Sequence, residues 1–271
     1  MSLSPASYRV QVLDRTCDIL ECLASNGPEL GVSEISLDLG LSKTTVHRLL
    51  SALAKREFVR RAPASGRYRL GIKLVELGQR AGDADSLVVS AGSYLTRLVA
   101  ETGETAHLGV LLDGQVVSLC AVESPKTLRK PATVGRRTPA HSSSLGKCML
   151  ADLTSAELTA ALAQLSLERF TPRTIVSYEV LSRELRKVRQ QGFAVDDEEF
   201  EQGLTCIGAP VRDASGRVIA ALSVAGPKSR LGSQVMEQHA ATVVRLALGL
   251  SKELGCRPTE DLAELRVRGV G

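Results

Sequence analysis

The stretch VSEISLDLGLSKTTVHRLLSAL, residues 32–53, predicts two helices joined by a sharp turn. Its first part mixes apolar residues with good helix formers up to Gly40, which tolerates the left-handed conformation of a tight turn. Ser42 is a strong N-cap residue, because its hydroxyl can accept a hydrogen bond from an open amide of the next helix. In that helix, apolar residues recur at the spacing that buries one face, namely Val46, Leu49, Leu50 and Leu53. The stretch therefore predicts a helix-turn-helix.

The opposite face of the second helix is rich in hydrogen-bond donors and has no carboxylate. Its residues are Lys43, Thr44, Thr45, His47, Arg48 and Ser51. Phosphates and guanine edges both accept hydrogen bonds, so this face suits the major groove of duplex DNA. A helical hairpin with a basic surface need not bind DNA, and the face alone leaves that alternative open.

Two strand-like runs follow the second helix: residues 58–61 (FVRR) and 67–70 (RYRL), on either side of APASG. Pro and Gly mark the connecting turn, so the runs predict a hairpin. Four arginines lie on it, and we expect Arg60, Arg61 and Arg67 to hold phosphates or the adjacent minor groove. Together the two helices and this wing predict a winged helix-turn-helix that binds double-stranded DNA, with Thr44, Thr45 and Arg48 as first candidates for reading bases.

The net charge of +4 is unevenly placed along the 271 residues. Residues 1–80 hold 12 Lys and Arg against 8 Asp and Glu, whereas the remainder holds 22 of each. The whole surplus lies on the segment that is expected to bind DNA, where it would displace counterions. The length allows two domains, each with its own core.

Several classes of protein are disfavoured by composition. No run of about 18 apolar residues is present, so we expect no membrane span. The first residues lack the layout of a signal peptide, and the six cysteines lack metal spacing, so we expect buried, reduced thiols in a cytoplasmic protein without a cofactor or metal. Trp is absent and aromatics make up 3%, so the core is aliphatic and offers no platform for single-stranded nucleic acid.

Around the motif, the apolar pattern predicts further helices. Leu13, Cys17, Leu20 and Ala24 share one face of a first helix over residues 12–25, which we expect to pack behind the helix-turn-helix. A short helix is predicted over residues 71–78 and a break at Gly82-Asp83. An amphipathic helix over residues 86–101 is interpreted as part of a linker that carries subunit or interdomain contacts, because no other core is evident for it.

From residue 104 the pattern becomes typical of strands. Residues 105–112 and 115–121 flank Asp113-Gly114, a strong hairpin signal. A second, almost entirely apolar hairpin is predicted over residues 206–211 and 217–224, which places it inside a sheet. Helices are expected near residues 144–153, 155–165, 178–191 and 233–254, the last burying Met236, Val243, Leu246 and Leu250, before a frayed tail. The fold class is therefore α+β, with a mostly antiparallel sheet and flanking helices.

These segments resemble the IclR family of bacterial transcriptional regulators over about residues 10–254. The resemblance is carried by LSKTTVHRLL (residues 41–50), YRLG (68–71), PAH running to GK (139–147), DDEE running to GLTCI (196–207) and ALSVAGP (221–227). It implies a winged helix-turn-helix over residues 8–72, linker helices over 73–102, a GAF-like effector domain over 103–256 and a flexible tail over 257–271. It also implies a homodimer, or a dimer of dimers, that binds a small metabolite.

The resemblance further implies the positions of the effector pocket. They are Ser144, Leu145, Asp196, Cys206, Ser223 and Ala225. Leu145 stands where relatives that bind small carboxylates often have a smaller residue, and Ala225 replaces a frequent Ser. The ligand of a relative is therefore not transferred, although an organic or aromatic acid is expected.

Several residues in this region have alternative interpretations. Residues 142–144, three serines before an apolar run, suit either an anion site or an ordinary N-cap. Residues 144–147 also fit the short S-x-x-K motif, but its companion motifs are missing. Residues 196–199 are interpreted as a solvated acidic loop from which Asp196 alone faces the pocket, rather than as a metal site. Cys206 is expected to be a pocket thiol and His107 a core histidine with satisfied hydrogen bonds.

The sequence thus predicts a regulator, repressor or activator, whose dimer places one recognition helix in each half of a palindromic operator. A metabolite in the C-terminal pocket would shift its affinity for DNA. The alternative is a hydrolase or transferase that uses Cys206 or Ser144 as nucleophile. A purely architectural DNA binder is a third class, disfavoured because the apolar, neutral C-terminal part offers no second DNA surface.

Overall fold

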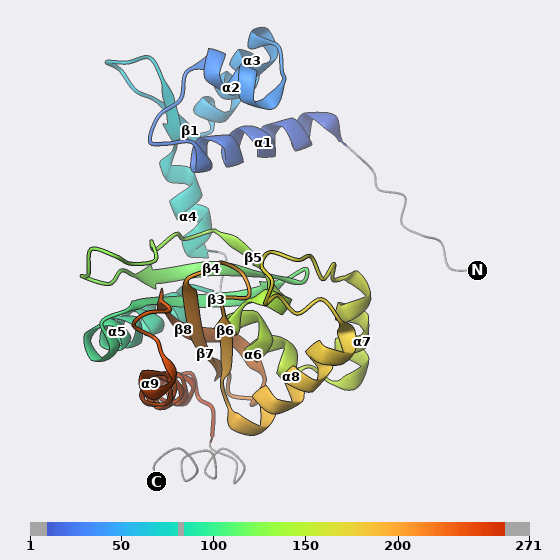
Figure 1. Cartoon of the computed structure of the whole chain (residues 1–271). Coiled ribbons are helices and arrows are strands. Elements are labelled where there is room, and N and C mark those ends of the chain that lie inside the picture. The colour runs from blue at the N-terminus through green and yellow to red at the C-terminus, as the bar shows by residue number, and fades with distance from the viewer. Residues whose placement is uncertain (1–9, 81–83, 258–271) are drawn as a thin grey trace. The chain divides into compact units, whose positions relative to one another are not determined.

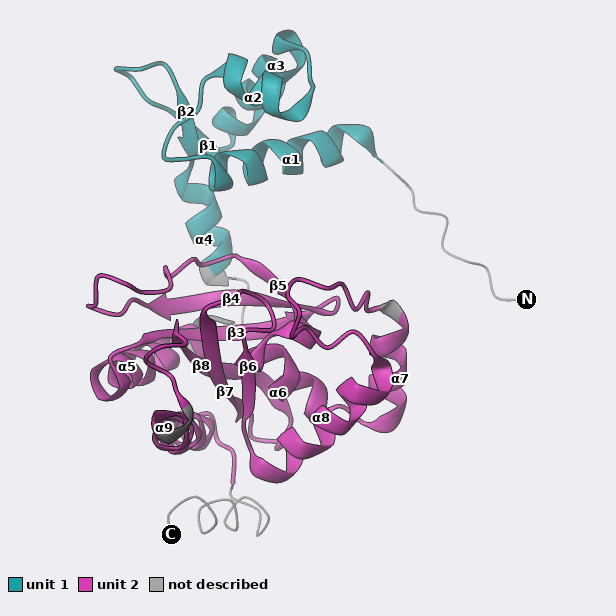
Figure 2. Ribbon diagram, viewed as in Figure 1, with its two compact units in different colours: residues 1–85 teal, residues 86–271 magenta. Residues whose placement is uncertain are grey.

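The computed structural model describes residues 10–80 and 84–257. The chain divides into two compact units, Met1–Asp85 and Ser86–Gly271, and each is described by itself (Figure 2). The predicted break at Gly82-Asp83 and the predicted tail beyond Arg257 lie outside the described residues.

The first unit is a small helical domain with a two-stranded hairpin (Figure 1). Its elements are α1 (Gln11–Ser25), α2 (Val32–Leu39), α3 (Lys43–Lys55), β1 (Val59–Arg61), β2 (Tyr68–Leu70) and α4 (Ile72–Arg80). The strands are antiparallel and pair Arg60 with Arg69. This order confirms the predicted winged helix-turn-helix.

The turn between α2 and α3 forms as the sequence predicts. Gly40 ends α2 with a φ of 64°, in the left-handed region that Gly occupies without steric cost. Ser42 caps α3, since its side chain accepts a hydrogen bond from the Thr45 amide at 3.2 Å. The four apolar residues predicted for α3, Val46, Leu49, Leu50 and Leu53, are all buried in the core of this unit.

The prediction for the buried face of α1 is wrong except for Leu20, which is half-buried and packs against the core of this unit. Leu13 is 60% exposed and Cys17 is also exposed, whereas Ile19, Cys22 and Leu23 enter the core. The N-terminal half of α1 extends beyond this core, so only its C-terminal turns supply buried residues. The buried residues Ile19, Cys22 and Leu23 also have helical spacing, so the other helices decide which face of α1 is buried.

The second unit is an α+β domain. Its helices are α5 (Ala84–Thr102), α6 (Ser144–Asp152), α7 (Ser155–Gln164), α8 (Tyr178–Gln191) and α9 (Ser233–Glu253), with a 3₁₀ turn at Ala140–Ser142. Its strands are β3 (Thr105–Leu112), β4 (Gln115–Val122), β5 (Arg137–Pro139), β6 (Ala194–Asp197), β7 (Leu204–Arg212) and β8 (Val218–Pro227). The predicted hairpins and helices are all present; β5 and β6 were not predicted.

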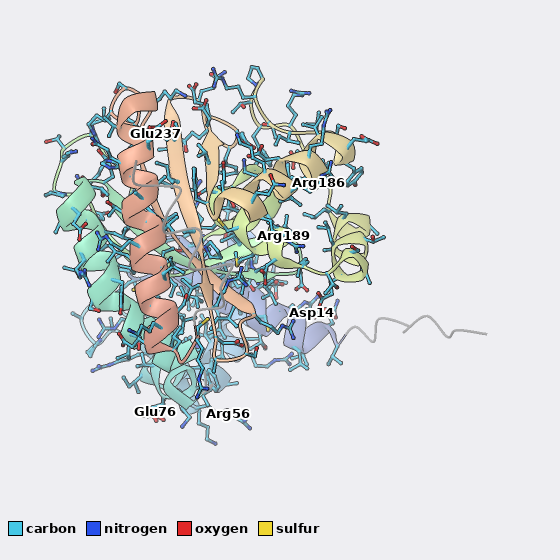
Figure 3. All side chains as sticks on the ribbon, turned by 90° about the horizontal axis from the view of Figure 1, so that it is seen from below. Asp14, Arg56, Glu76, Arg186, Arg189 and Glu237 are labelled. Carbon is cyan, nitrogen blue, oxygen red and sulfur yellow. The ribbon has the colours of Figure 1, made fainter. Side chains whose placement is uncertain are left out.

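The strands of residues 84–257 form one antiparallel six-stranded sheet in the order β5-β4-β3-β8-β7-β6. The apolar β7–β8 hairpin is interior, as predicted. Helices α5 and α9 cover one face of the sheet, and α6, α7 and α8 lie on the other (Figure 1). Seen from below, α9 carries Glu237 on one side of the sheet and α8 carries Arg186 and Arg189 on the other (Figure 3).

Strand alternation gives the two faces different chemistry. In β8, Ala220, Leu222 and Val224 enter the core beneath α5 and α9. Ser223 and Ala225 face the opposite way, because successive side chains in a strand alternate. The α6 face of the sheet therefore has small and polar residues at one end, where large apolar side chains would otherwise fill the space.

Two further expectations are wrong. The helix α5 does have a core to pack against, because Leu87, Ala91, Leu95 and Leu98 are buried with residues of α9 and the sheet. The six cysteines are free, but Cys17 is exposed and Cys120 only half-buried. Within residues 10–80 and 84–257, no helix is long and apolar enough to cross a membrane.

Candidate functional site

The polar face of α3 is accessible. Lys43, Thr44, His47 and Arg48 are exposed, while Thr45 is half-buried. The Thr45 hydroxyl lies 2.9 Å from the Ser42 hydroxyl, so it takes part in the helix cap. The face that the sequence predicts for DNA therefore presents cationic and imidazole groups to solvent. The Thr45 hydroxyl is engaged at the cap of its own helix.

The two wing arginines whose side chains form no hydrogen bond or ion pair among the described residues form one cross-strand pair. Arg60 and Arg69 lie directly opposite each other, and both are exposed. Like charges in this position destabilise a hairpin, and an anionic partner would relieve the repulsion. Arg69 was not among the predicted contact residues, although the alternation of the two strands was a signal that could have identified it.

The other two wing arginines bind within the protein. The Arg67 guanidinium forms an ion pair with Glu34 at 2.6 Å and donates to the Glu29 carbonyl at 3.1 and 3.2 Å. The Arg61 Nε donates to the Gly66 carbonyl, and its guanidinium lies 5.9 Å from the centre of the Tyr68 ring. These contacts order the wing, so Arg67 in particular is held by α2 and its preceding loop.

The second candidate site is a pocket on the α6 face of the sheet, called the sheet pocket below. Six of its lining residues are those implied by the family resemblance: Ser144, Leu145, Asp196, Cys206, Ser223 and Ala225. It is also lined by residues of β3, β4 and the loop before β5, and it holds about 570 Å³ of empty space, part of it open to solvent. The structure thus brings the six positions together at the first turn of α6.

Two buried polar atoms in the wall of the sheet pocket have no hydrogen-bond partner among the described residues. They are His107 Nε2 and Ser118 Oγ. The expectation that His107 is a satisfied core histidine is therefore wrong. Because buried polar groups are normally hydrogen-bonded, these atoms point to a ligand or water that would satisfy them.

Two cations stand at one side of the same pocket. Lys130 and Arg136 lie over the Phe200 ring, with the Lys130 Nζ 6.0 Å and the Arg136 guanidinium carbon 5.6 Å from its centre. Neither forms an ion pair within the described part of the chain. Burial, reinforced by these two charges, lowers the pKa of His107 to about 4, so the imidazole is neutral at physiological pH.

The acidic stretch beside the pocket is not a solvated loop, which corrects the prediction. Asp196 and Glu199 are 3% and 7% exposed. Lys147, which is fully buried, forms an ion pair with Glu199 and donates to the Val195 carbonyl at 2.5 Å. Asp196 Oδ1 accepts the Glu199 amide at 2.8 Å, so α6 and this loop are held together at the pocket wall.

Two of the three serines at residues 142–144 account for the two roles that the sequence left open. Ser143 caps α6, accepting from the Gly146 amide at 3.0 Å. Ser143 and Ser144 also line the sheet pocket. The start of this helix therefore lies at the pocket, where an anion is favoured.

Cys206 is poorly suited to act as a nucleophile. Burial and the neighbouring Asp196 raise the pKa of its thiol, whereas catalysis needs the thiolate. No cluster of His, Cys, Asp and Glu side chains with the arrangement of a metal site occurs in the described ranges. The sheet pocket is thus equipped to bind a polar or anionic molecule by hydrogen bonds and charge.

Comparison with protein families gives matches over nearly the whole chain. The family described as the IclR helix-turn-helix domain matches residues 12–63. The family described as bacterial transcriptional regulator IclR C-terminal matches residues 80–252.

Individual proteins give the same picture. The chain is 37% identical to the HTH-type transcriptional regulator XynR of Escherichia coli strain K12, covering 91% of this chain and 98% of that protein. The crystal structure of the Thermotoga maritima IclR superposes with a TM-score of 0.75 at 30% identity, covering 91% of this chain and 100% of that chain. The crystal structure of an IclR homolog from Microbacterium hydrocarbonoxydans, complexed with 4-hydroxybenzoate, superposes with a TM-score of 0.79 at 27% identity. The match covers 90% of this chain and 98% of that chain.

Proposed function

The chain belongs to the IclR family of bacterial transcriptional regulators, and we propose that it binds its operator as a dimer under the control of a small organic acid. The observation that carries the ligand half is the sheet pocket, in which unpaired cations face buried polar atoms without partners. The proposal covers both a repressor and an activator.

The DNA half of the proposal is supported by the exposed face of α3 and by the wing. Arg48, Lys43, Thr44 and His47 are positioned to enter a major groove. On the wing, Arg60 and Arg69 are the residues free to contact phosphates or the minor groove, since Arg67 is engaged with Glu34. We assign Arg67, and in part Arg61, to ordering the wing.

The expected effector is a carboxylate that also carries hydroxyl groups. Its carboxylate would lie near Lys130 and Arg136, and its hydroxyls would reach His107 Nε2 and Ser118 Oγ. The apolar residues Val116, Leu145 and Phe200 leave room for a carbon skeleton or a ring. The Microbacterium homolog was crystallised in complex with 4-hydroxybenzoate, which has a carboxylate, a hydroxyl and a ring. This molecule provides a first probe.

Control follows if the effector has different affinities for two states of the dimer. A coupling free energy of about 1 to 3 kcal/mol would change operator affinity roughly 5- to 150-fold. No chemical step on the ligand is needed, so we propose a regulator acting in the cytoplasm rather than an enzyme. The protonated thiol of Cys206 supports this choice over the hydrolase alternative.

The proposal is tested by gel-shift titration on an operator selected from random duplex DNA. Arg48→Ala should weaken specific binding at least tenfold, because it removes a charged donor from the recognition face. Arg56→Ala, which removes an exposed charge from the C-terminal end of the same helix, is the matched control and should bind almost normally.

The ligand half uses the same titration with a panel of organic and aromatic acids, including 4-hydroxybenzoate. Ser223→Leu should fill the sheet pocket, so this variant binds the operator normally but no longer responds to the acid that affects the wild type. Unchanged operator affinity of Arg48→Ala would reject the assigned interface. An undiminished ligand response of Ser223→Leu would place the effector elsewhere.

A further inference from the structure

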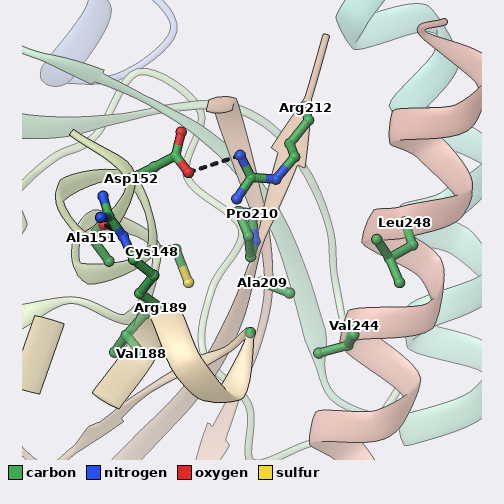
Figure 4. A pocket seen from close by; sticks show the side chains of 11 residues that line it. Cys148, Ala151, Asp152, Val188, Arg189, Ala209, Pro210, Arg212, Val244 and Leu248 are labelled. Atoms are coloured by element: carbon green, nitrogen blue, oxygen red, sulfur yellow. Dashed lines mark hydrogen bonds and ion pairs between the residues drawn. The ribbon is translucent and has the colours of Figure 1, made fainter. Parts of the chain in front are cut away.

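A second pocket lies in the second unit at the edge of the sheet, and is called the edge pocket below. It is lined by the last turns of α6, by α8, by the end of β7 and by α9, and holds about 490 Å³ of empty space, part of it open to solvent (Figure 4). The strand β6 pairs with β7 only as far as Gly208, so Ala209 to Arg212 have no strand on their outer side. The pocket occupies this uncovered edge.

Arg212 is the central polar group of the edge pocket. Its Nη1 donates to the Gly216 carbonyl at 2.8 Å and forms an ion pair with Asp152 Oδ1 at 2.7 Å. Its Nε is buried and has no partner, and Nη2 donates to no other residue in the described ranges. Nε and Nη2 form one edge of the guanidinium plane, which is the fork that binds a carboxylate with two parallel hydrogen bonds.

The charge around the edge pocket also favours an anion. Asp152 is already engaged by Arg212 and by the Val218 amide at 3.2 Å. Arg189 donates only to the carbonyls of Ala151 and Leu153, at 2.7 and 3.0 Å, so its positive charge is not matched by a carboxylate in the described part of the chain. Two arginines and one aspartate leave a surplus of one positive charge.

The remaining walls are apolar. Cys148, Val188, Ala209, Pro210, Val244 and Leu248 supply them, as the close view shows (Figure 4). A polyhydroxylated ligand would leave its hydroxyls without partners against these side chains, whereas a hydrocarbon tail gains free energy from burial there. The walls thus favour an acid with an apolar tail.

We propose that the edge pocket is a second ligand site, which binds a short-chain apolar monocarboxylate through the open edge of Arg212. The helix α6 connects it to the sheet pocket, because Ser144 and Leu145 lie at one end of this helix and Cys148, Ala151 and Asp152 toward the other. An occupant also contacts α9, which shares a core with α5. The site does not depend on the proposed function, since binding is measured without DNA.

The test is isothermal titration of the full chain with hexanoate. We expect saturable binding of one hexanoate per chain, and at least tenfold weaker binding of the neutral hexanamide, which cannot form the charge-assisted fork. Arg212→Met should weaken hexanoate binding at least tenfold. Arg217→Met is the matched control with unchanged affinity, because Arg217 is 74% exposed and pairs only with Glu157 among the described residues.

Two further variants keep the result decisive if Arg212→Met is poorly folded. Val244→Trp leaves Arg212 intact and fills the pocket from α9, so it should abolish binding. Ser223→Leu blocks the sheet pocket and should leave hexanoate binding unchanged. The proposal is overturned if the wild type shows no saturable binding, if Val244→Trp binds normally, or if Ser223→Leu loses the affinity.

Discussion

Lys147 shows how a single residue can organise a binding site without lining it. Its ammonium group is fully buried and is satisfied by Glu199 and the Val195 carbonyl. Burial raises the pKa of Glu199 to about 7, an effect that Lys147 opposes. Burying such an ion pair has a large desolvation cost, so it adds little to the net stability of the fold. The pair instead fixes the position of Asp196 and Phe200 beside α6.

His107 gives stability a defined pH dependence. Its pKa is lowered from 6.5 to about 4 by burial, so in that interval the unfolded chain binds a proton that the folded chain does not. Stability therefore rises with pH through this window and is lost as pH falls. From pH 7 to pH 5 the loss attributable to His107 is about 2 kcal/mol.

The measurement is urea unfolding of the wild type and of His107→Gln at both pH values. The variant has no group that titrates at this position, so its stability should fall by about 2 kcal/mol less than that of the wild type. Equal losses in the two proteins would show that the folded imidazole titrates normally.

At the scale of elements, α6 depends on how closely its first turn approaches the 3₁₀ turn before it. A Cβ at Gly146 would lie 2.3 Å from the Ala140 carbonyl oxygen and 2.4 Å from the Ala140 Cα. Both are backbone atoms and cannot move aside as a flexible side chain would. The lack of a side chain at Gly146 therefore places Ser144 and Leu145 at the pocket.

Gly146→Ala should destabilise the second unit by about 2 kcal/mol or more, through overpacking against backbone. Gly92→Ala is the matched control, since Gly92 also lies in a helix but a Cβ there meets nothing within 4 Å. That change should stabilise the protein by up to about 1 kcal/mol, the difference in helix propensity. Thermal unfolding followed by circular dichroism measures both, and equal effects would contradict the steric argument.

At the scale of the whole molecule, each unit buries its own hydrophobic core. The core of the first unit includes Ile35, Val46 and Leu50, and that of the second includes Leu108 and Leu222. Domains with separate cores can unfold in separate transitions.

We therefore expect two calorimetric transitions. Leu50→Ala and Leu222→Ala each remove a fully buried side chain, at a cost of about 2 to 5 kcal/mol. Each should lower the transition of its own unit and leave the other nearly unchanged. A single transition lowered equally by both variants would show that the units unfold together.

Prediction from sequence succeeded where local signals and burial agreed. Gly40 and Ser42 defined the turn between α2 and α3, and Asp113-Gly114 defined the β3–β4 hairpin. It failed for β6, because Asp196-Asp197-Glu198-Glu199 is acidic, and a run of like charges is usually solvated. Ion pairs with residues distant in sequence, such as that of Glu199 with Lys147 and those of Asp197 with Arg173 and Lys228, offset the burial of this stretch.

The sequence by itself determined the winged helix-turn-helix, the α+β class and, through the family resemblance, six positions that meet in the sheet pocket. These follow from turns, caps and periods that act between near neighbours. Tertiary structure alone decided that Arg67 pairs with Glu34, that His107 Nε2 lacks a partner, and that Arg212 presents an open edge to a second pocket. Such properties depend on which groups distant in the chain come within hydrogen-bonding reach, and no local pattern encodes that distance.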